Sequence, residues 1–432
     1  MMNKIYRNKK IAAVFIYLLL IIACATPSRI SNKNLAFLYN KESYPIHFDY
    51  SIYHVNDTLS RIYFSVSAQD LLYMKHDDGL HYFSKILVSY KLFRSYESKE
   101  IIDSSSTQMI ALAITNNDEH ELCGSVDMRV TQGNEYLLEL EINDLNRGQS
   151  AIKYTQVDKI GKYSHQNFSI KNYSSNSIHY GANIETNNLL LIHYRDTTVK
   201  KLYGRYYKRQ FPLALPPFSI ENETQFDYRP DSIFTIKVDS NFKFMPKGEG
   251  FYHFQIDSSR KEGLTLYCFH EKYPLVNKPF DLIAPLRYIT TNEEFDNLIT
   301  KNNKASIDQF WLNTADNNTE RAKDLIKIFY NRVVEANQYY SSYVEGWKTD
   351  RGMLYVVLGP PNLVYKSSDS ESWIYGEENN LMSITYTFTK IDNPFTNNDY
   401  SLARSPIYKN MWYRAVDTWR QGRVYTKSTS PF

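Results

Sequence analysis

The chain opens with a segment typical of an export signal, and this limits how the remainder can be held together. Four basic residues precede an apolar stretch from Ile11 to Ile22. The stretch is too short to span a bilayer and lacks the flanks of a stop-transfer helix, so residues 1–23 are predicted to be a cleaved signal peptide. Beyond Cys24 the sequence holds only Cys123 and Cys268. An exported chain with so few cysteines must be stabilised by its apolar cores.

Cys24 ends the signal segment in a run of two isoleucines, an alanine and the cysteine. This run resembles the bacterial lipoprotein signal, in which the cysteine sulfur is diacylated and the cysteine becomes the mature N-terminus. The resemblance implies a lipidated Cys24, a membrane as partner and an outer-membrane location. No acidic cluster follows, so we expect the anchored chain to face the periplasm. The alternative is a cysteine that happens to lie near the end of an ordinary signal peptide. Residues 24–42 show no core pattern and are predicted to form a tether.

Charge and cysteine placement exclude some classes of function. Without residues 1–23, 46 Lys and Arg face 47 Asp and Glu, so the mature chain is close to neutral and no nucleic-acid partner is expected. Cys123 and Cys268 fall in different predicted domains, which argues against a disulfide between them. Each lies in a strand-like run, and we expect both to be buried thiols.

Two β-rich domains are predicted before residue 286. From residue 43 to 158, seven short runs alternate apolar and polar residues between polar turns, which favours a β-sandwich of immunoglobulin-like size. From 159 to 285 the pattern continues less regularly, with its clearest strands at 189–194, 251–254 and 264–269. We interpret this part as a second β-sandwich-like domain.

The last part, residues 286–432, changes character and is predicted to be an α+β domain with helices packed on a small antiparallel sheet. A helix from about Thr319 places its apolar residues on one face, and Gly346 is predicted to end it in a left-handed conformation. The apolar run Met353–Leu358 is predicted to be a strand, and residues 382–389 alternate strictly as a half-buried strand should. Ser405-Pro406 opens a closing helix.

The run from Gly346 to Gly352 reads Gly-Trp-Lys-Thr-Asp-Arg-Gly, and Gly359-Pro360-Pro361 follows it. These residues resemble the GWxTD-domain family of Gram-negative envelope proteins, and the resemblance implies no catalytic activity. The short Gly-Pro turn, with Trp373-x-Tyr375 and an alternating strand after it, also resembles the small lipoproteins of the outer-membrane β-barrel assembly machinery. The motif residues are Gly346, Trp347, Thr349, Asp350, Arg351, Gly352, Gly359 and Pro360.

Two interpretations of this motif are open. In the structural one, Trp347 fills the crevice between helix and sheet, Thr349 and Asp350 accept backbone N–H groups, Arg351 pairs with a carboxylate, and Gly352 adopts a conformation closed to other residues. In the functional one, Asp350 and Arg351 contact a ligand at the turn. We favour the structural interpretation, because every position has a structural task.

A search for enzyme signatures finds none: no phosphate loop, no HExxH, no GxSxG and no zinc-like spacing of Cys and His. We therefore expect no catalytic residue, no metal site and no cofactor. Three short triplets resemble an O-glycosylation signal of some Gram-negative periplasms, with acceptors at Thr58, Thr197 and Ser232.

The sequence therefore indicates a structural or interaction component of an envelope assembly, secretion or motility complex, with envelope proteins as partners. The first alternative is a carbohydrate-binding or glycan-processing lipoprotein, since the chain has 37 tyrosines and exposed aromatics are common in sugar sites. The second is a hydrolase with its site around Asp350. An exposed aromatic cluster that breaks the period of two would favour the sugar-binding alternative.

Overall fold

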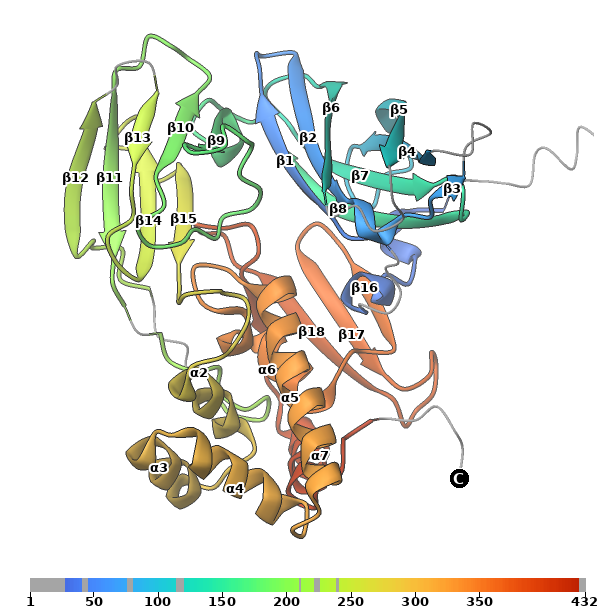
Figure 1. The fold of residues 1–432 in the computed structure, drawn as a ribbon, viewed down its shortest axis with the longest axis vertical. Helices are drawn as coiled ribbons and strands as arrows, with labels where there is room; N and C mark the ends of the chain where they lie inside the picture. The colour runs from blue at the N-terminus through green and yellow to red at the C-terminus, as the bar shows by residue number, and fades with distance from the viewer. Residues whose placement is uncertain are drawn as a thin grey trace, which may run out of the picture.

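The structure of the protein is a computed structural model, which describes residues 28–40, 46–75, 81–113, 120–209, 211–220, 226–237 and 241–426. Cys24 and the signal segment lie outside these residues. Both β-rich parts lie on the same side of the C-terminal helices and sheet (Figure 1). Within the described residues, no helix combines the length and the apolar character needed to cross a membrane.

The first β-rich part is a sandwich of two antiparallel sheets. Strands β1 (Phe48–His54), β2 (Leu59–Ser67) and β6 (Glu121–Arg129) form one sheet, and β3 (Met74–Lys75), β4 (Tyr82–Phe93), β5 (Ile101–Ala113), β7 (Glu135–Asp144) and β8 (Gln149–Asp158) form the other. Side chains that alternate along the strands, such as Phe64, Leu92 and Leu140, are fully buried between the sheets. The predicted sandwich is confirmed.

The second β-rich part also has two sheets. The smaller one contains β9 (Phe168–Asn172), β10 (Leu190–Tyr194) and β13 (Phe242–Phe244), and the larger one contains β12 (Ser232–Lys237), β11 (Lys201–Tyr207), β14 (Gly250–Gln255) and β15 (Leu264–Cys268). Their inner faces share one apolar core. Both cysteines that the structure describes are free.

Cys268 is buried in this second core, as predicted, whereas the prediction for Cys123 is wrong. Cys123 is exposed because β6 alternates, and its inward positions are taken by Leu122, Gly124 and Val126. Gly124 lies against the ring of Phe64, where a Cβ atom would be 2.5 Å from the nearest ring carbon. An alternating strand can bury only one face, and the cysteine lies on the other.

The C-terminal part is the predicted layer of helices on a small sheet. Helices α2 (Pro279–Ile283), α3 (Asn292–Lys301), α4 (Lys304–Thr314), α5 (Thr319–Tyr340), α6 (Asp350–Leu358) and α7 (Lys409–Arg420) accompany the sheet β16 (Leu363–Lys366), β17 (Ser370–Tyr375), β18 (Ile384–Lys390) and β19 (Tyr400–Leu402). Thr291 and Glu294 form a full capping box at the start of α3.

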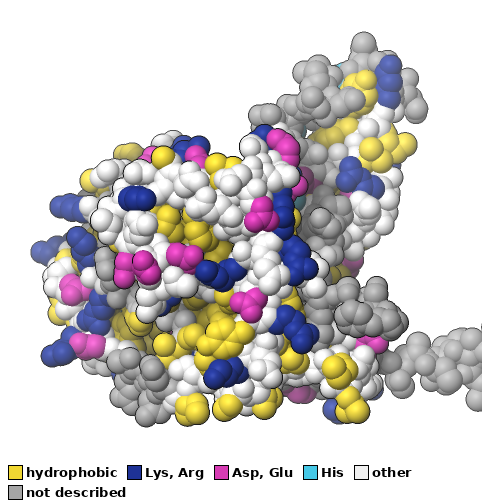
Figure 2. All heavy atoms as spheres, turned by 90° about the horizontal axis from the view of Figure 1, so that it is seen from below, with side chains coloured by type: hydrophobic (Ala, Val, Ile, Leu, Met, Phe, Trp, Pro, Cys, Tyr) yellow, Lys and Arg dark blue, Asp and Glu magenta, His cyan; other side chains and the backbone are white. Residues whose placement is uncertain are grey.

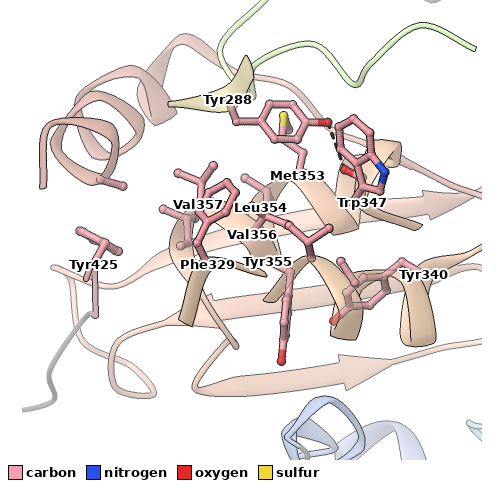
Figure 3. Packing of buried hydrophobic residues seen from close by; sticks show 14 of the residues in the cluster. Tyr288, Phe329, Tyr340, Trp347, Met353, Leu354, Tyr355, Val356, Val357 and Tyr425 are labelled. Atoms are coloured by element: carbon pink, nitrogen blue, oxygen red, sulfur yellow. Dashed lines mark hydrogen bonds between the residues drawn. The ribbon is translucent and has the colours of Figure 1, made fainter. Parts of the chain in front are cut away.

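The run Met353–Leu358 is a helix, so the predicted strand is wrong. It belongs to α6, whose residues are all buried because the helix lies inside the domain, in contact with α5 and α7 (Figure 3). A short run that is apolar on every side fits a central strand and a buried helix equally well. The capping residue Thr349, whose hydroxyl accepts a hydrogen bond from the N–H of Gly352, marks it as a helix.

Residues 28–40 are also not the tether that we predicted. They form two short 3₁₀ helices, η1 (Ile30–Asn32) and η2 (Ala36–Tyr39), which lie beside β16 (Figure 1). Ile30, Leu35 and Tyr39 belong to the core of the C-terminal part. Their spacing matches neither a helix nor a strand, which is why no core pattern is visible in the sequence.

Each β-sandwich has its own contact with the C-terminal part. Phe93 and Leu137 of the first sandwich belong to the same buried cluster as η1, η2 and α6. An aromatic cluster of Tyr207, Phe251, Tyr267 and Phe395 joins the second sandwich to the loop before β19, and the Tyr267 hydroxyl donates to the carbonyl of Phe395 over 2.7 Å. The three parts therefore share buried surfaces.

Candidate functional site

The two glycines of the Gly-Trp-x-Thr-Asp run bring three segments of backbone into contact. Helix α5 ends at Tyr340, and Gly346 begins a short 3₁₀ helix, η7 (Gly346–Lys348), so the prediction that Gly346 ends the long helix is wrong. A Cβ atom at Gly346 would lie 2.0 Å from the carbonyl oxygen of Ala336, and one at Gly352 would lie 1.9 Å from that of Gly346. Gly352 is helical, so close approach, and not a left-handed conformation, requires these glycines.

Trp347 is buried at this crossing, as predicted, but between α5 and helix α6. Its side chain is 3% exposed, and its ring lies 6.0 Å from that of Tyr288. The Trp347 N–H donates to Oδ1 of Asn337 over 3.1 Å, and its carbonyl accepts from the Tyr288 hydroxyl at the same distance (Figure 3). Trp347 therefore fixes η7 to α5 through its backbone and fills the space beside it with its ring.

Asp350 attaches the start of α6 to the last strand of the sheet. Oδ2 accepts from the N–H of Leu402 over 2.7 Å, and Oδ1 lies 2.5 Å from the guanidinium of Arg404. Asp350 is 8% exposed and occupies the first turn of the helix, where the backbone N–H groups favour a negative charge. Its carboxylate is thus engaged within the protein.

Arg351 pairs with a carboxylate, as predicted, and the partner is Glu371 of β17 at 3.1 Å. Lys366 of β16 lies 3.3 Å from the same carboxylate, and the indole N–H of Trp373 donates to it over 2.6 Å. The guanidinium of Arg351 also donates to the carbonyl of Asn398 and stacks 4.1 Å from the ring centre of Tyr400. We call Arg351, Lys366 and Glu371 the buried charge cluster.

The cluster holds its carboxylate ionised. Glu371 is fully buried, and burial alone would raise its pKa, but Lys366 and Arg351 outweigh this effect and lower the pKa to about 2. The sequence offers no signal for Lys366 or Glu371, because each lies in an ordinary strand pattern. They meet Arg351 only through the fold.

Gly359 and Pro360 end helix α6. Gly359 has a φ of +86°, and a Cβ atom there would lie 2.7 Å from the guanidinium of the buried Arg332. Its carbonyl accepts from the Tyr375 hydroxyl over 2.8 Å. Pro360 follows on the surface. Both ends of α6 are therefore fixed by motif residues.

The predicted glycosylation acceptors and His253 lie away from the motif. Thr58, Thr197 and Ser232 are all exposed, as glycosyl acceptors must be, and their modification stays a prediction. His253 is buried in β14, where it contacts the hydroxyl of Thr265 and the carbonyl of Lys261, each at 2.8 Å. Among the described residues, no group of three His, Cys, Asp or Glu is placed to hold a metal ion.

A pocket of about 310 Å³ lies away from the motif, between α3, α4 and α7. Its lining is polar and apolar in about equal parts, and the polar part includes Asn297, Gln309, Asn313 and the ion pair of Glu294 with Arg420. Figure 2 views the molecule from this side and shows apolar side chains near the centre, with charges of both signs among them.

Comparison with known families identifies one match. Residues 250–421 match the family model of the GWxTD domain, so the chain contains a GWxTD domain. The match takes in β14 and β15 of the second sandwich together with the helices and the small sheet. None of the curated proteins compared with the chain matches it.

Proposed function

We propose that this chain is a lipid-anchored, non-enzymatic structural protein of the outer membrane that faces the periplasm. It holds two β-sandwiches and a GWxTD domain in a fixed arrangement and presents them to protein partners in an envelope assembly, secretion or motility complex. Fold alone does not assign a function, so the proposal relies on what the motif side chains do.

The observation that carries the proposal is that the motif faces inward. Trp347, Asp350 and Arg351 are all less than 9% exposed, and each side chain contacts another part of the same domain. A catalytic or binding group must reach a ligand, and these groups are used to hold α5, α6 and the sheet together. The motif therefore supports a scaffold.

The N-terminal segment also supports a fixed arrangement. Five residues, 25–29, separate Cys24 from the buried Ile30. A fully extended chain covers about 3.3–3.6 Å per residue, so the predicted anchor and the docked segment can be separated by about 20 Å. A lipidated Cys24 would then hold the junction of the first sandwich and the GWxTD domain close to the membrane.

Burial of the tryptophans favours this role over sugar binding. The chain has five tryptophans, Trp311, Trp347, Trp373, Trp412 and Trp419, and all of them are at most 5% exposed. Sugar sites use exposed aromatic faces, and the tryptophans of this chain serve its core.

Asp350→Asn tests the structural interpretation, because it keeps the shape and removes the charge. We expect the free energy of unfolding to fall by about 1–3 kcal/mol, since Arg404 would then face a neutral amide. Urea unfolding measures the loss, and complementation of a deletion strain measures function. Ile307→Val in helix α4 is the control for a loss of stability away from the motif, because it should lower the free energy of unfolding by about 0.5–1.5 kcal/mol and leave complementation intact. Normal stability with abolished complementation would contradict the proposal and favour a ligand site at Asp350.

Cys24→Ser tests the anchor. Stable membrane attachment needs more than one acyl chain, so removing the acceptor sulfur should move the protein from the detergent phase to the aqueous phase or leave it unprocessed. Phase partitioning followed by immunoblotting measures this, with Cys123→Ser as the control that should partition normally. Unchanged partitioning of the Cys24 variant would rule out lipidation at this residue.

A further inference from the structure

The GWxTD domain holds residues 30–39 in the manner of a bound peptide. The segment lies outside the matched range of 250–421, and in the sequence two sandwiches separate it from the helices and the small sheet. It contributes two short 3₁₀ helices and no strand to the C-terminal sheet. We propose that β16 and the buried charge cluster form an exchangeable peptide-binding groove, for which residues 30–39 are the ligand within the same chain.

The peptide backbone is recognised at the edge of the sheet. Strand β16 is the terminal strand of its sheet, so among the described residues one side of it has no neighbouring strand. The N–H of Leu35 donates to the carbonyl of Val364 over 2.8 Å, and the N–H of Val364 donates to Oδ1 of Asn34 over 3.0 Å. Both backbone groups of Val364 are thus satisfied by the segment, one by a backbone N–H and one by a side-chain oxygen, so the segment covers the open edge of the sheet.

Tyr39 provides the side-chain specificity. It is 5% exposed, and its ring centre lies 5.1 Å from that of Tyr340 and 5.7 Å from those of Tyr339 and Trp373. The ammonium of Lys366 donates to its hydroxyl over 3.1 Å. The Tyr355 hydroxyl lies 2.9 Å from its carbonyl oxygen. The ligand class is therefore a peptide that contains an asparagine and, after four intervening residues, a tyrosine.

The charges of the groove stay compensated when its occupant leaves. Arg351 and Lys366 are paired with Glu371, so removal of Tyr39 uncovers no unpaired charge. Release also takes Ile30, Leu35 and Tyr39 out of the core that they share with the GWxTD domain, so the docked state is the resting one. The inference does not depend on lipidation: the scaffold role uses the docked segment, and the inference concerns its release.

The test uses the full mature chain with Cys24→Ser, in which Leu35→Glu and Tyr39→Ala prevent docking of the segment. A labelled synthetic peptide of residues 28–40 is titrated into it, and fluorescence anisotropy measures binding. We expect a single site, no binding to the chain with an intact segment at the same concentrations, and binding about tenfold weaker for the Tyr39→Phe peptide, which lacks the hydroxyl. Lys366→Met should remove that difference, and the exposed Lys237→Met should not.

A folded variant that does not bind the peptide overturns the proposal, as does equal binding of the Tyr39→Ala peptide. If the variant does not fold, hydrogen exchange of the backbone amides is measured instead, in the chain that keeps its native segment. Exchange of the Leu35 N–H at least a hundredfold faster than the N–H groups of α6 supports a segment that opens on its own. Equal rates, set by global unfolding, overturn the proposal.

Discussion

Trp347→Ala is expected to lower the free energy of unfolding of the GWxTD domain by about 3–5 kcal/mol, because truncation of a buried tryptophan leaves a cavity that its neighbours fill only in part. The ring is 3% exposed and packs against Tyr288, where η7 crosses α5. All five tryptophans lie between residues 311 and 419, so tryptophan fluorescence during urea unfolding reports on this domain without a signal from the sandwiches.

The control for this variant is Tyr413→Ala in α7, where the ring is 48% exposed and truncation should cost less than about 1 kcal/mol. Trp347→Phe should recover part of the loss, because it refills part of the cavity. A loss below 1 kcal/mol for Trp347→Ala would mean that the crossing does not depend on the ring. The shape of the turn would then depend on the glycines alone.

The β-rich parts could be predicted from the sequence because their strands have one buried and one exposed face. In β4, the residues Ile86, Val88, Tyr90 and Leu92 are buried and the residues between them are not, so the period of two is visible in the sequence. The same rule places Cys123 on the outer face of β6, once its inward neighbours are counted. Alternation determines the element and also the face.

Helix α6 could not be identified in this way, because it is buried on all sides and has no polar face to show a period. The signal that could have found it is Thr349, a capping residue placed three residues before Gly352 and followed by an acidic residue in the first turn. Residues 30–39 carry no such local signal. Their burial depends on β16 and Trp373, more than 300 positions away in the sequence.

The motif combines both kinds of information. The tasks of Trp347 and Thr349 could be deduced from residue type, whereas Gly346 and Gly352 are required by close backbone approach, which the sequence alone does not show. Asp350 and Arg351 act over long range, on Arg404 and Glu371, so the sequence predicts that they have partners without identifying them. The buried charge cluster is therefore the part of the site that only the structure reveals.

Glu371→Gln is expected to lower the free energy of unfolding by about 3–5 kcal/mol, because it leaves the buried Arg351 and the partly buried Lys366 without a compensating anion. Glutamine preserves the shape of the side chain, so the loss of stability measures the effect of the charge.

A double variant tests whether Arg351 and Glu371 are coupled. Adding Arg351→Met to Glu371→Gln should lower the free energy of unfolding by less than Arg351→Met lowers it in the unchanged chain, since it removes one of the uncompensated cations. Additive losses, within about 0.5 kcal/mol, would show that Arg351 and Glu371 are not coupled. Asp308→Asn breaks the exposed pair with Lys304 and should cost less than about 1 kcal/mol.

The difference in free energy of unfolding between the Glu371→Gln variant and the unchanged chain should also depend on pH. The pKa of Glu371 is about 2 in the folded state, below the value of about 4.3 expected when the chain is unfolded. A carboxyl whose pKa is lowered by folding stabilises the protein above its unfolded pKa, and this contribution is lost as the pH falls toward the folded pKa. Urea unfolding at pH 7 and at pH 3 should therefore show a smaller difference between the two chains in acid. A difference that is the same at both pH values would mean that the loss at pH 7 comes from packing and not from the buried charge.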